Sequence, residues 1–233
     1  MSITRGTKHT YLGMNFEVIN GKVVMDMESY LDECISSFEE SVASSAATPA
    51  NKALMVINNN STKLNDDKRE LFHHIVQKML HILCKRTRLV DLQVAIGFLC
   101  TRVRSPSLQD WLKLRRVLQY VHGTKDLKRV VSIDNFGRID IFVVDASHGA
   151  HTDYPGQTGG CMKMGSGILH GRSSKQNLNS KSSTESELIG VSDYPPYSIW
   201  MLNFYKEQGY EIGKVVLQQD NESTIKILSC NIN

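Results

Sequence analysis

Apolar and polar residues alternate near the start of the chain in the pattern typical of β-strands. Apolar and aromatic residues recur over residues 9–19, and a second such run covers residues 22–27. Asn20-Gly21 lies between the two runs, and both residues tolerate the positive φ angles of a type I′ turn. The pattern predicts a β-hairpin, followed over residues 28–38 by apolar residues at helical spacing.

The middle of the chain carries helical periodicity. Residues 41–62 are small and polar and include Pro49, so they predict a loop. Asn65 is suited to cap the helix that follows, and His122-Gly123 is suited to end the last helix of this part. Three helices are predicted here: one that Asn65 caps and whose periodic apolar run covers residues 71–83, and two over residues 92–103 and 108–121.

After Lys125 the pattern changes to strands mixed with helices. Residues 139–144 form a β-rich run with apolar residues on both faces at its end, as in a buried central strand. Residues 156–171 are rich in glycine and predict one or two hairpins. Pro195-Pro196 is expected to interrupt the helical pattern of this part. The remaining elements predicted are helices over residues 184–191, 198–208 and 222–228 and a strand over residues 215–219. The fold class expected is α/β, or α+β for the chain as a whole.

Charge is unevenly distributed around a net value of +3. Lys and Arg outnumber Asp and Glu by 16 to 7 between residues 60 and 138, whereas the rest of the chain has 11 basic and 17 acidic residues. A segment that binds phosphates beside a segment that binds metal would show this asymmetry. Solvated helix faces would show it as well.

The sequence also argues against several classes of protein. It has no apolar run of membrane-spanning length and no secretory signal pattern, so we expect no membrane partner. The five cysteines are widely spaced and include no Cys-x-x-Cys, which disfavours a disulfide framework or a zinc ribbon. We therefore expect an intracellular protein, in the cytoplasm or the nucleus.

Acidic residues end two predicted strands and begin a predicted helix. Asp145 ends the strand that contains residues 139–144, on the same face as Ile139, Ile141 and Val143, and Asp220 ends the strand at residues 215–219. Asp145 could instead be a turn residue, and Asp220 could be the N-cap of the next helix. Carboxylates that converge from different elements can hold two Mg²⁺ ions about 4 Å apart for phosphodiester hydrolysis.

Glu185 and Glu187 are alternative third members of this set. They lie two residues apart, so on a helix their side chains point to different sides. Both Ser182-x-x-Glu185 and Thr184-x-x-Glu187 fit the capping-box pattern. If Ser182 is the cap, Glu185 is used in capping and Glu187 is free to bind a metal ion. The apolar periodicity of the helix does not decide which of the two glutamates faces the site.

Other groups of potential ligands have simpler explanations. His148-x-x-His151 followed by Asp153 could hold a metal ion, but a polar loop accounts for it more simply. The histidines and the cysteine at positions 73, 74, 81 and 84 lack a second ligand pair and are expected on helix faces.

Several motifs carry a resemblance to a known family. Residues 174–188 contain Ser-Lys-Gln and then Ser-Ser-Thr-Glu-Ser-Glu-Leu, and residues 219–223 read Gln-Asp-Asn-Glu-Ser. Residues 144–147 read Val-Asp-Ala-Ser, and residues 158–160 read Thr-Gly-Gly. These motifs resemble the ribonuclease H domain of copia-type LTR retrotransposon polyproteins.

The first half of the chain resembles the preceding part of the same polyproteins. Tyr-Leu-Gly-Met at residues 11–14 resembles a strand after the reverse transcriptase palm, and Leu-Gln-Tyr-Val-His-Gly-Thr at residues 118–124 resembles the thumb and connection region. The Tyr-x-Asp-Asp polymerase motif is absent, so DNA synthesis by this chain alone is not expected. The resemblance implies three parts: residues 1–50 as the end of the palm, residues 51–130 as a basic helical thumb/connection remnant, and residues 131–233 as a truncated ribonuclease H-like mixed sheet with helices.

The resemblance also implies site residues and chemistry. Asp145, Glu187 and Asp220 match the family's metal-binding carboxylates, which favours Glu187 over Glu185. The implied activity is Mg²⁺-dependent cleavage of the RNA strand of RNA–DNA hybrids, with two ions in a complete site and Mn²⁺ as an alternative. Ser147, Ser183 and Asn221 match positions that could contact nucleic acid.

The implied partners are the hybrid or duplex backbone, bound along the basic helices, and other segments of the polyprotein. The family's fourth acidic residue lies in a His-x-Asp segment that this sequence does not contain. The alternatives are therefore a nucleic-acid-binding remnant without turnover and an inert relic.

Overall fold

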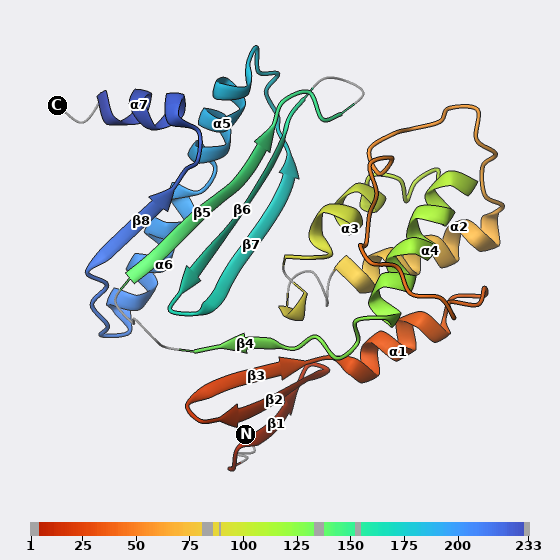
Figure 1. Cartoon of the computed structure of the whole chain (residues 1–233). Helices are drawn as coiled ribbons and strands as arrows, with labels where there is room; N and C mark the ends of the chain where they lie inside the picture. The colour runs from red at the N-terminus through yellow and green to blue at the C-terminus, as the bar shows by residue number, and fades with distance from the viewer. Residues whose placement is uncertain (1–4, 81–85, 89, 133–137, 152–154, 231–233) are drawn as a thin grey trace. The chain divides into compact units, whose positions relative to one another are not determined.

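The computed structural model describes residues 5–80, 86–88, 90–132, 138–151 and 155–230, and for residues 138 and 140–145 it describes the backbone only. The chain divides into two compact units, residues 1–130 and 131–233. Figure 1 labels their helices and strands.

The first unit begins with short antiparallel strands. These are β1 (Lys8–Tyr11), β2 (Met14–Ile19) and β3 (Lys22–Asp26), and the sheet order is β1-β2-β3-β4, with β4 at Arg129–Val131. The turn at Asn20-Gly21 is confirmed, with φ angles of 49° and 75°. The single strand predicted over residues 9–19 is wrong, because the chain turns at Leu12-Gly13 with φ angles of 50° and 75°.

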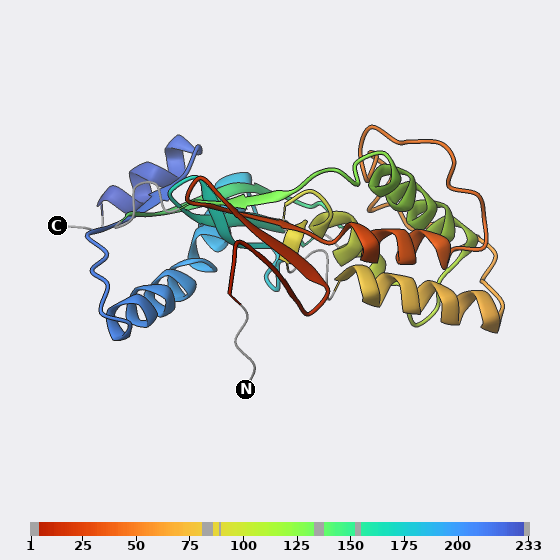
Figure 2. The ribbon, with the colours of Figure 1, turned by 90° about the horizontal axis from the view of Figure 1, so that it is seen from below.

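Four helices of this unit surround one hydrophobic core (Figure 1). They are α1 (Glu28–Ser36), α2 (Asp66–Lys78), α3 (Gln93–Cys100) and α4 (Leu108–His122). The Asn65 side chain accepts a hydrogen bond from the Lys68 backbone N–H, which confirms the predicted N-cap of α2. Trp111 of α4 is fully buried and stacks on Phe38 with a centroid distance of 4.6 Å. Figure 2 shows α1, α2 and α4 side by side around this core.

Residues 41–62 contain no helix or strand, as predicted. Core residues come from residues 27–42 as well as from α2, α3 and α4, so residues 1–50 and 51–130 pack around the same core.

The second unit is built on a mixed sheet with the strand order β7-β6-β5-β8. Its strands are β5 (Arg138–Ser147), β6 (Gln157–Met164), β7 (Gly167–Lys175) and β8 (Lys214–Gln218). β5 is parallel to β8 and antiparallel to β6, and β6 is antiparallel to β7. The mixed sheet and the helices of both units confirm an α+β fold.

Three helices complete this unit: α5 (Ser183–Ser192), α6 (Pro195–Glu207) and α7 (Glu222–Cys230). α5 packs against β5 and β6, and α7 packs against α5 (Figure 1). Pro195-Pro196 separates α5 from α6 as predicted, but α6 begins at Pro195 rather than at residue 198. A proline fits the first helical turn because its missing N–H would have no partner there. None of the helices that the structure describes combines the length and apolar character needed to span a bilayer.

Candidate metal centre

Two of the predicted site positions lie at the same edge of the mixed sheet. β5 and β8 are adjacent and parallel, and their register places Phe142 opposite Gln218. Asp145 lies three residues beyond Phe142, and Asp220 lies two residues beyond Gln218. Because the carboxyl ends of parallel strands meet at one edge, these positions are neighbours. The Asp145 backbone pairs with Gly159 of β6, and its side chain lies outside the described residues.

The N-terminus of α5 separates the roles of its two glutamates. The Ser182 hydroxyl accepts a hydrogen bond from the Glu185 N–H at 3.2 Å, so Ser182 is the N-cap. The Glu185 carboxylate accepts a hydrogen bond from the Lys181 N–H at 2.6 Å. Glu185 is therefore used at the start of the helix, as expected for the case in which Ser182 is the cap.

Glu187 instead faces the sheet edge and is 7% exposed. Its Oε1 accepts a hydrogen bond from the Ala146 N–H at 3.3 Å, and its Oε2 accepts one from Gln219 Nε2 at 3.2 Å. Ala146 follows Asp145 in the chain, and Gln219 precedes Asp220. The Glu187 carboxylate thus lies between the residues adjoining the two aspartates. Within the described residues it forms no ion pair.

Asp220 is exposed between β8 and α7. The N-cap of α7 is Asn221, whose Oδ1 accepts a hydrogen bond from the Thr224 N–H at 2.9 Å. The capping role considered for Asp220 therefore belongs to its neighbour. Thr224 is fully buried and donates a hydrogen bond to the Thr184 carbonyl at 3.4 Å, which attaches α7 to the start of α5.

Residues outside the predicted set hold α5 against the sheet. A Cβ at Gly190 would lie 3.2 Å from the Ala146 Cβ and 3.4 Å from Thr158 Cγ2, so glycine permits the close approach of α5. Buried Gln176 donates hydrogen bonds from Nε2 to Thr158 Oγ1 and to the Ser186 carbonyl, both at 2.9 Å. The only sequence signal for Gly190 was a glycine inside a helical pattern.

The histidines near the site contact uncharged side chains. His148 Nδ1 is hydrogen-bonded to Ser180 Oγ at 2.9 Å, and Ser180 Oγ is in turn bonded to Ser186 Oγ. His151 Nε2 is hydrogen-bonded to Gln157 Oε1 at 2.8 Å. Asp153 lies outside the described residues. Among the side chains that are described, which exclude Asp145, no three His, Cys, Asp or Glu residues form a metal-binding group.

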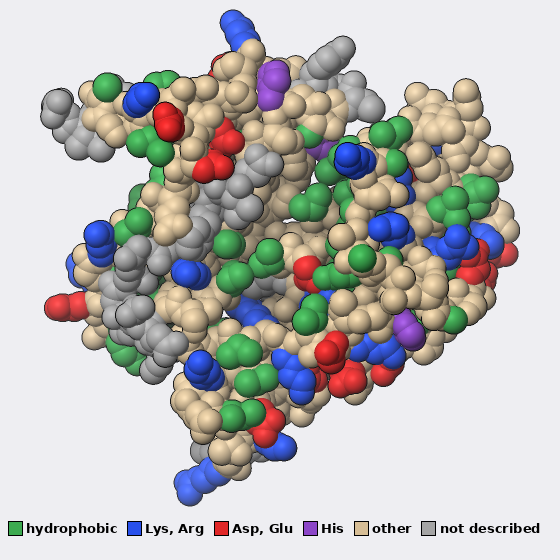
Figure 3. Space-filling view, in the orientation of Figure 1, with side chains coloured by type: hydrophobic (Ala, Val, Ile, Leu, Met, Phe, Trp, Pro, Cys, Tyr) green, Lys and Arg blue, Asp and Glu red, His purple; other side chains and the backbone are tan. Residues whose placement is uncertain are grey.

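The basic helices are partly neutralised within their own unit. Acidic residues from positions 26–40 pair with basic residues from the positively charged segment. These pairs are Asp26 with Lys128, Asp32 with Lys125, Glu33 with Lys78, and Glu40 with Lys68 and Arg115. Figure 3 shows Asp and Glu beside Lys and Arg over this unit. Residues 1–130 contain 19 Lys and Arg and 13 Asp and Glu. This basic excess is smaller than that of residues 60–138 alone, where the counts are 16 and 7.

The fold and site define an α+β protein with acidic residues at the carboxyl ends of two parallel strands. Comparison with known proteins then gives its relatives. The chain is 26% identical over 191 residues to a Saccharomyces cerevisiae protein named after transposon Ty5-1, and the match covers 81% of this chain and 60% of that protein. It is 24% identical over 239 residues to the transposon Ty1-BR Gag-Pol polyprotein of the same yeast, covering 96% of this chain and 13% of the polyprotein.

A plant protein shows the same relationship. The retrovirus-related Pol polyprotein from transposon RE2 of Arabidopsis thaliana is 23% identical over 204 residues, with 88% of this chain and 14% of the polyprotein covered. No family model matches the chain, and no solved structure matches it. The chain is thus a relative of Ty1/copia-type retrotransposon polyproteins, which confirms the resemblance inferred from its motifs. It spans only part of the length of these three relatives.

Proposed function

We propose that residues 131–233 form a ribonuclease H-like domain of retrotransposon origin, in which Asp145, Glu187 and Asp220 bind Mg²⁺. Its reaction is hydrolysis of the RNA strand of an RNA–DNA hybrid. The observation that carries the proposal is the position of the Glu187 carboxylate, which is buried between the residues adjoining the two aspartates.

The donor set fits a hard divalent cation. A buried carboxylate is costly unless it is paired with a cation or coordinates a metal, and Glu187 has only N–H donors as described partners. Carboxylate oxygens are the protein ligands that Mg²⁺ prefers, and Mn²⁺ accepts them too. When two such ions are bound, they supply an activated water and stabilise the leaving oxygen.

The protein's own contribution is to orient the Glu187 carboxylate. The Ala146 N–H and Gln219 Nε2 each hold one oxygen, so the carboxylate plane is fixed relative to both strand ends. Hydrogen bonds from neighbouring groups to a ligand's oxygens hold that ligand in the orientation a metal ion needs. Gly190 allows α5 to approach closely enough for these bonds to form.

The relatives support the choice of substrate, since the Ty1-BR and RE2 proteins are named as Gag-Pol and retrovirus-related Pol polyproteins. On this proposal the partners are the RNA–DNA hybrid and other segments of such a polyprotein. The remaining basic excess of residues 1–130 favours contact with the phosphate backbone, with an affinity that falls steeply as salt rises.

The test uses the full chain and an RNA–DNA hybrid labelled on the RNA strand. We expect cleavage of the RNA in Mg²⁺ and none in EDTA. Asp145→Asn and Asp220→Asn should each lower the rate by about 100-fold or more, because each removes a charged ligand. Glu185→Gln is the matched control and should retain activity, since Glu185 is bonded to the Lys181 N–H.

Cleavage that is unaffected by Asp145→Asn would contradict the assigned site. Salt-sensitive binding of the hybrid without cleavage would support the non-catalytic alternative. Circular dichroism of each variant shows whether a lost activity reflects a lost fold.

A further inference from the structure

The loop of residues 41–62, here called the strap, runs along one face of α4. Four α4 side chains hold it, and they recur every three or four residues, as expected for one helix face. The bonds join Gln109 Oε1 to the Asn58 N–H at 3.0 Å, Lys113 Nζ to the Val56 carbonyl at 2.7 Å, Arg116 Nη2 to Thr48 Oγ1 at 3.1 Å, and Gln119 Nε2 to Ser44 Oγ at 2.7 Å. The strap is therefore fixed to α4 along most of its length.

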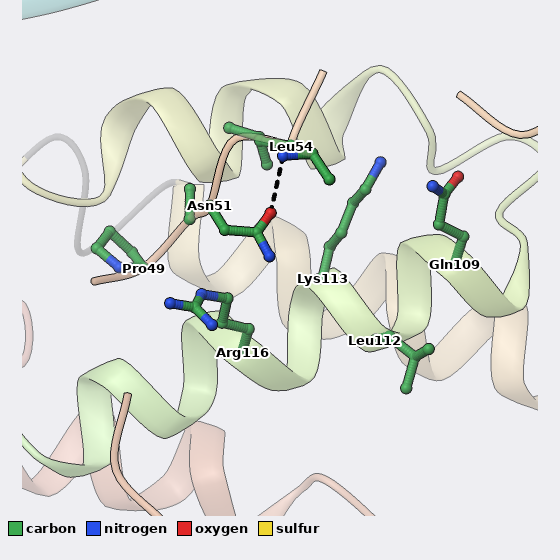
Figure 4. A pocket seen from close by; sticks show the side chains of 9 residues that line it. Pro49, Asn51, Leu54, Gln109, Leu112, Lys113 and Arg116 are labelled. Atoms are coloured by element: carbon green, nitrogen blue, oxygen red, sulfur yellow. Dashed lines mark hydrogen bonds between the residues drawn. The ribbon is translucent and has the colours of Figure 1, made fainter. Parts of the chain in front are cut away.

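A cavity of about 190 Å³ lies between the strap and α4 (Figure 4). The strap contributes mainly apolar groups, including Pro49 and Leu54, and α4 contributes Leu112. The charged groups of the lining are Lys113 and Arg116, and the described lining includes no Asp or Glu. The cavity therefore combines an apolar surface with two positive charges.

The guanidinium group of Arg116 has a donor that no described residue uses. Its Nε is buried and has no hydrogen-bond partner in the described part of the chain, whereas its Nη2 is bonded to Thr48. A buried donor without an acceptor is destabilising, so an acceptor is expected there. Figure 4 shows Arg116 and Asn51 on the same side of the cavity, and the Asn51 Oδ1 is already bonded to the Ala53 N–H. The Asn51 amide NH₂ is thus a second donor for a ligand.

Lys113 adds a charge that is poorly solvated. Burial lowers the pKa of its ammonium group, although the nearby Asp110 carboxylate acts in the opposite direction. The ammonium lies 4.5 Å from the centroid of the Phe98 ring. Neither Lys113 nor Arg116 forms an ion pair within the described residues, and the nearby Asp110 carboxylate is paired with Arg102.

We propose that this cavity binds a small carboxylate with a compact apolar body. The carboxylate would accept hydrogen bonds from Arg116, which suits paired oxygens, and the apolar body would contact Leu54 and Leu112. A free aliphatic acid and the last residue of a peptide ending in leucine share this chemistry. A nucleotide fits less well, because the described lining has no aromatic side chain on which a base could stack.

The experiment measures binding to the full chain by calorimetric titration with three carboxylate-related probes and with uridine monophosphate as a nucleotide comparison. N-acetyl-leucine has both the charge and the apolar body, N-acetyl-leucinamide has only the body, and acetate has only the charge. We expect N-acetyl-leucine to bind with a Kd on the order of 0.1–1 mM, which is typical of a ligand of this size. N-acetyl-leucinamide and acetate should each bind at least about tenfold more weakly. Equal binding of the amide would overturn the proposal, as would tighter binding of uridine monophosphate.

Variants connect the binding to the cavity. Arg116→Gln should weaken binding of N-acetyl-leucine by about tenfold or more, because it removes the charge and the buried donor. Arg69→Gln is the matched control, since Arg69 is on α2 and pairs with exposed Asp66. Ala53→Phe narrows the cavity from its exposed strap side and should also abolish binding, which keeps the test valid if Arg116→Gln fails to fold. Binding that survives both substitutions would refute the assignment.

A last comparison separates the two sources of the ligand. A short peptide ending in Ala-Leu is titrated beside the same peptide with a C-terminal amide. Tighter binding of the acid peptide than of N-acetyl-leucine indicates a peptide terminus. Exclusion of the acid peptide with retention of N-acetyl-leucine indicates a free organic acid.

Discussion

Replacing Glu187 by glutamine removes one negative charge from the sheet edge and keeps the shape of the side chain. In EDTA two effects oppose each other. The amide NH₂ can no longer accept one of the bonds from Ala146 or Gln219, which costs about 1–3 kcal/mol, and the loss of an unpaired buried carboxylate is favourable. We expect the free energy of unfolding to stay within about 2 kcal/mol of the wild-type value.

In saturating Mg²⁺ the two proteins should diverge. A ligand at about 100 times its Kd stabilises the folded state by roughly 2.7 kcal/mol. For a unit the size of residues 131–233, each kcal/mol raises the melting temperature by about 4–8 °C. The wild-type transition should therefore move up by roughly 10 °C or more, whereas that of Glu187→Gln should move far less.

Scanning calorimetry with and without Mg²⁺ measures this difference, and Glu185→Gln is its control. That substitution lies two residues away on α5 and weakens only the bond to the Lys181 N–H. It should lower stability by about 0.5–1 kcal/mol in EDTA and in Mg²⁺ alike, leaving the Mg²⁺ shift intact. If Glu187→Gln kept the full wild-type shift, Glu187 would be a structural carboxylate and the metal centre would be wrong.

Two further predictions concern packing and thiol chemistry. Gly190→Ala gains about 1 kcal/mol of helix propensity but brings a methyl group to 3.2 Å from the Ala146 Cβ. Calorimetry should therefore show little net change in the free energy of unfolding, together with a smaller Mg²⁺-induced rise in melting temperature. The control Gly97→Ala has open space around its Cβ and should stabilise the protein by about 0.5–1 kcal/mol. Burial raises the pKa of the Cys34 thiol to about 11, so iodoacetamide at about pH 8 should modify exposed Cys230 well before Cys34 by peptide mass spectrometry. Because the unfolded Cys34 thiol loses its proton first, near its ordinary pKa of 9.0, this group should also lower stability as the pH rises from about 9 to about 11.

Elements with strong local signals were predictable from sequence. These elements depend only on residues close together in the sequence, and they include the Asn20-Gly21 turn, the Asn65 cap and the strand of residues 139–144. The turn at Leu12-Gly13 was missed because a leucine at positive φ is uncommon. β4 was missed because three residues carry no periodicity, and this strand exists only through its pairing in the sheet.

The candidate site was predictable to the level of strand ends and no further. The pattern placed Asp145 and Asp220 at strand ends, whereas Asp145 lies inside β5, which continues to Ser147, so the turn role considered for it is wrong. The parallel pairing of β5 with β8, which makes the two aspartates neighbours, is a long-range contact. The orientation of Glu187 follows from Ser182 acting as the cap, one of two arrangements that the sequence allowed. Gln219 and Gly190 were missed because their roles depend on the packing of α5 across the sheet.

The charge asymmetry shows a different limit of sequence reasoning. The basic excess belongs to residues 60–138, yet acidic partners of five of its basic side chains lie at positions 26–40. Ion pairs between segments this far apart cannot be read from a window of sequence. Part of the apparent phosphate-binding charge therefore serves packing within residues 1–130, and surface pairs of this kind contribute little stability each.

The two proposed sites can fail independently, because they belong to units with separate cores. The cavity is formed by residues that pack around the core containing Trp111 and Leu114, whereas the carboxylates adjoin the core containing Ile139 and Val191. Substitutions without shared partners are generally additive in free energy. Arg116→Gln should therefore leave the Mg²⁺ shift unchanged, and Glu187→Gln should leave the affinity for N-acetyl-leucine unchanged. A cross-effect in either direction would show that the two units are energetically coupled, and a loss of one activity could then no longer be assigned to its own site.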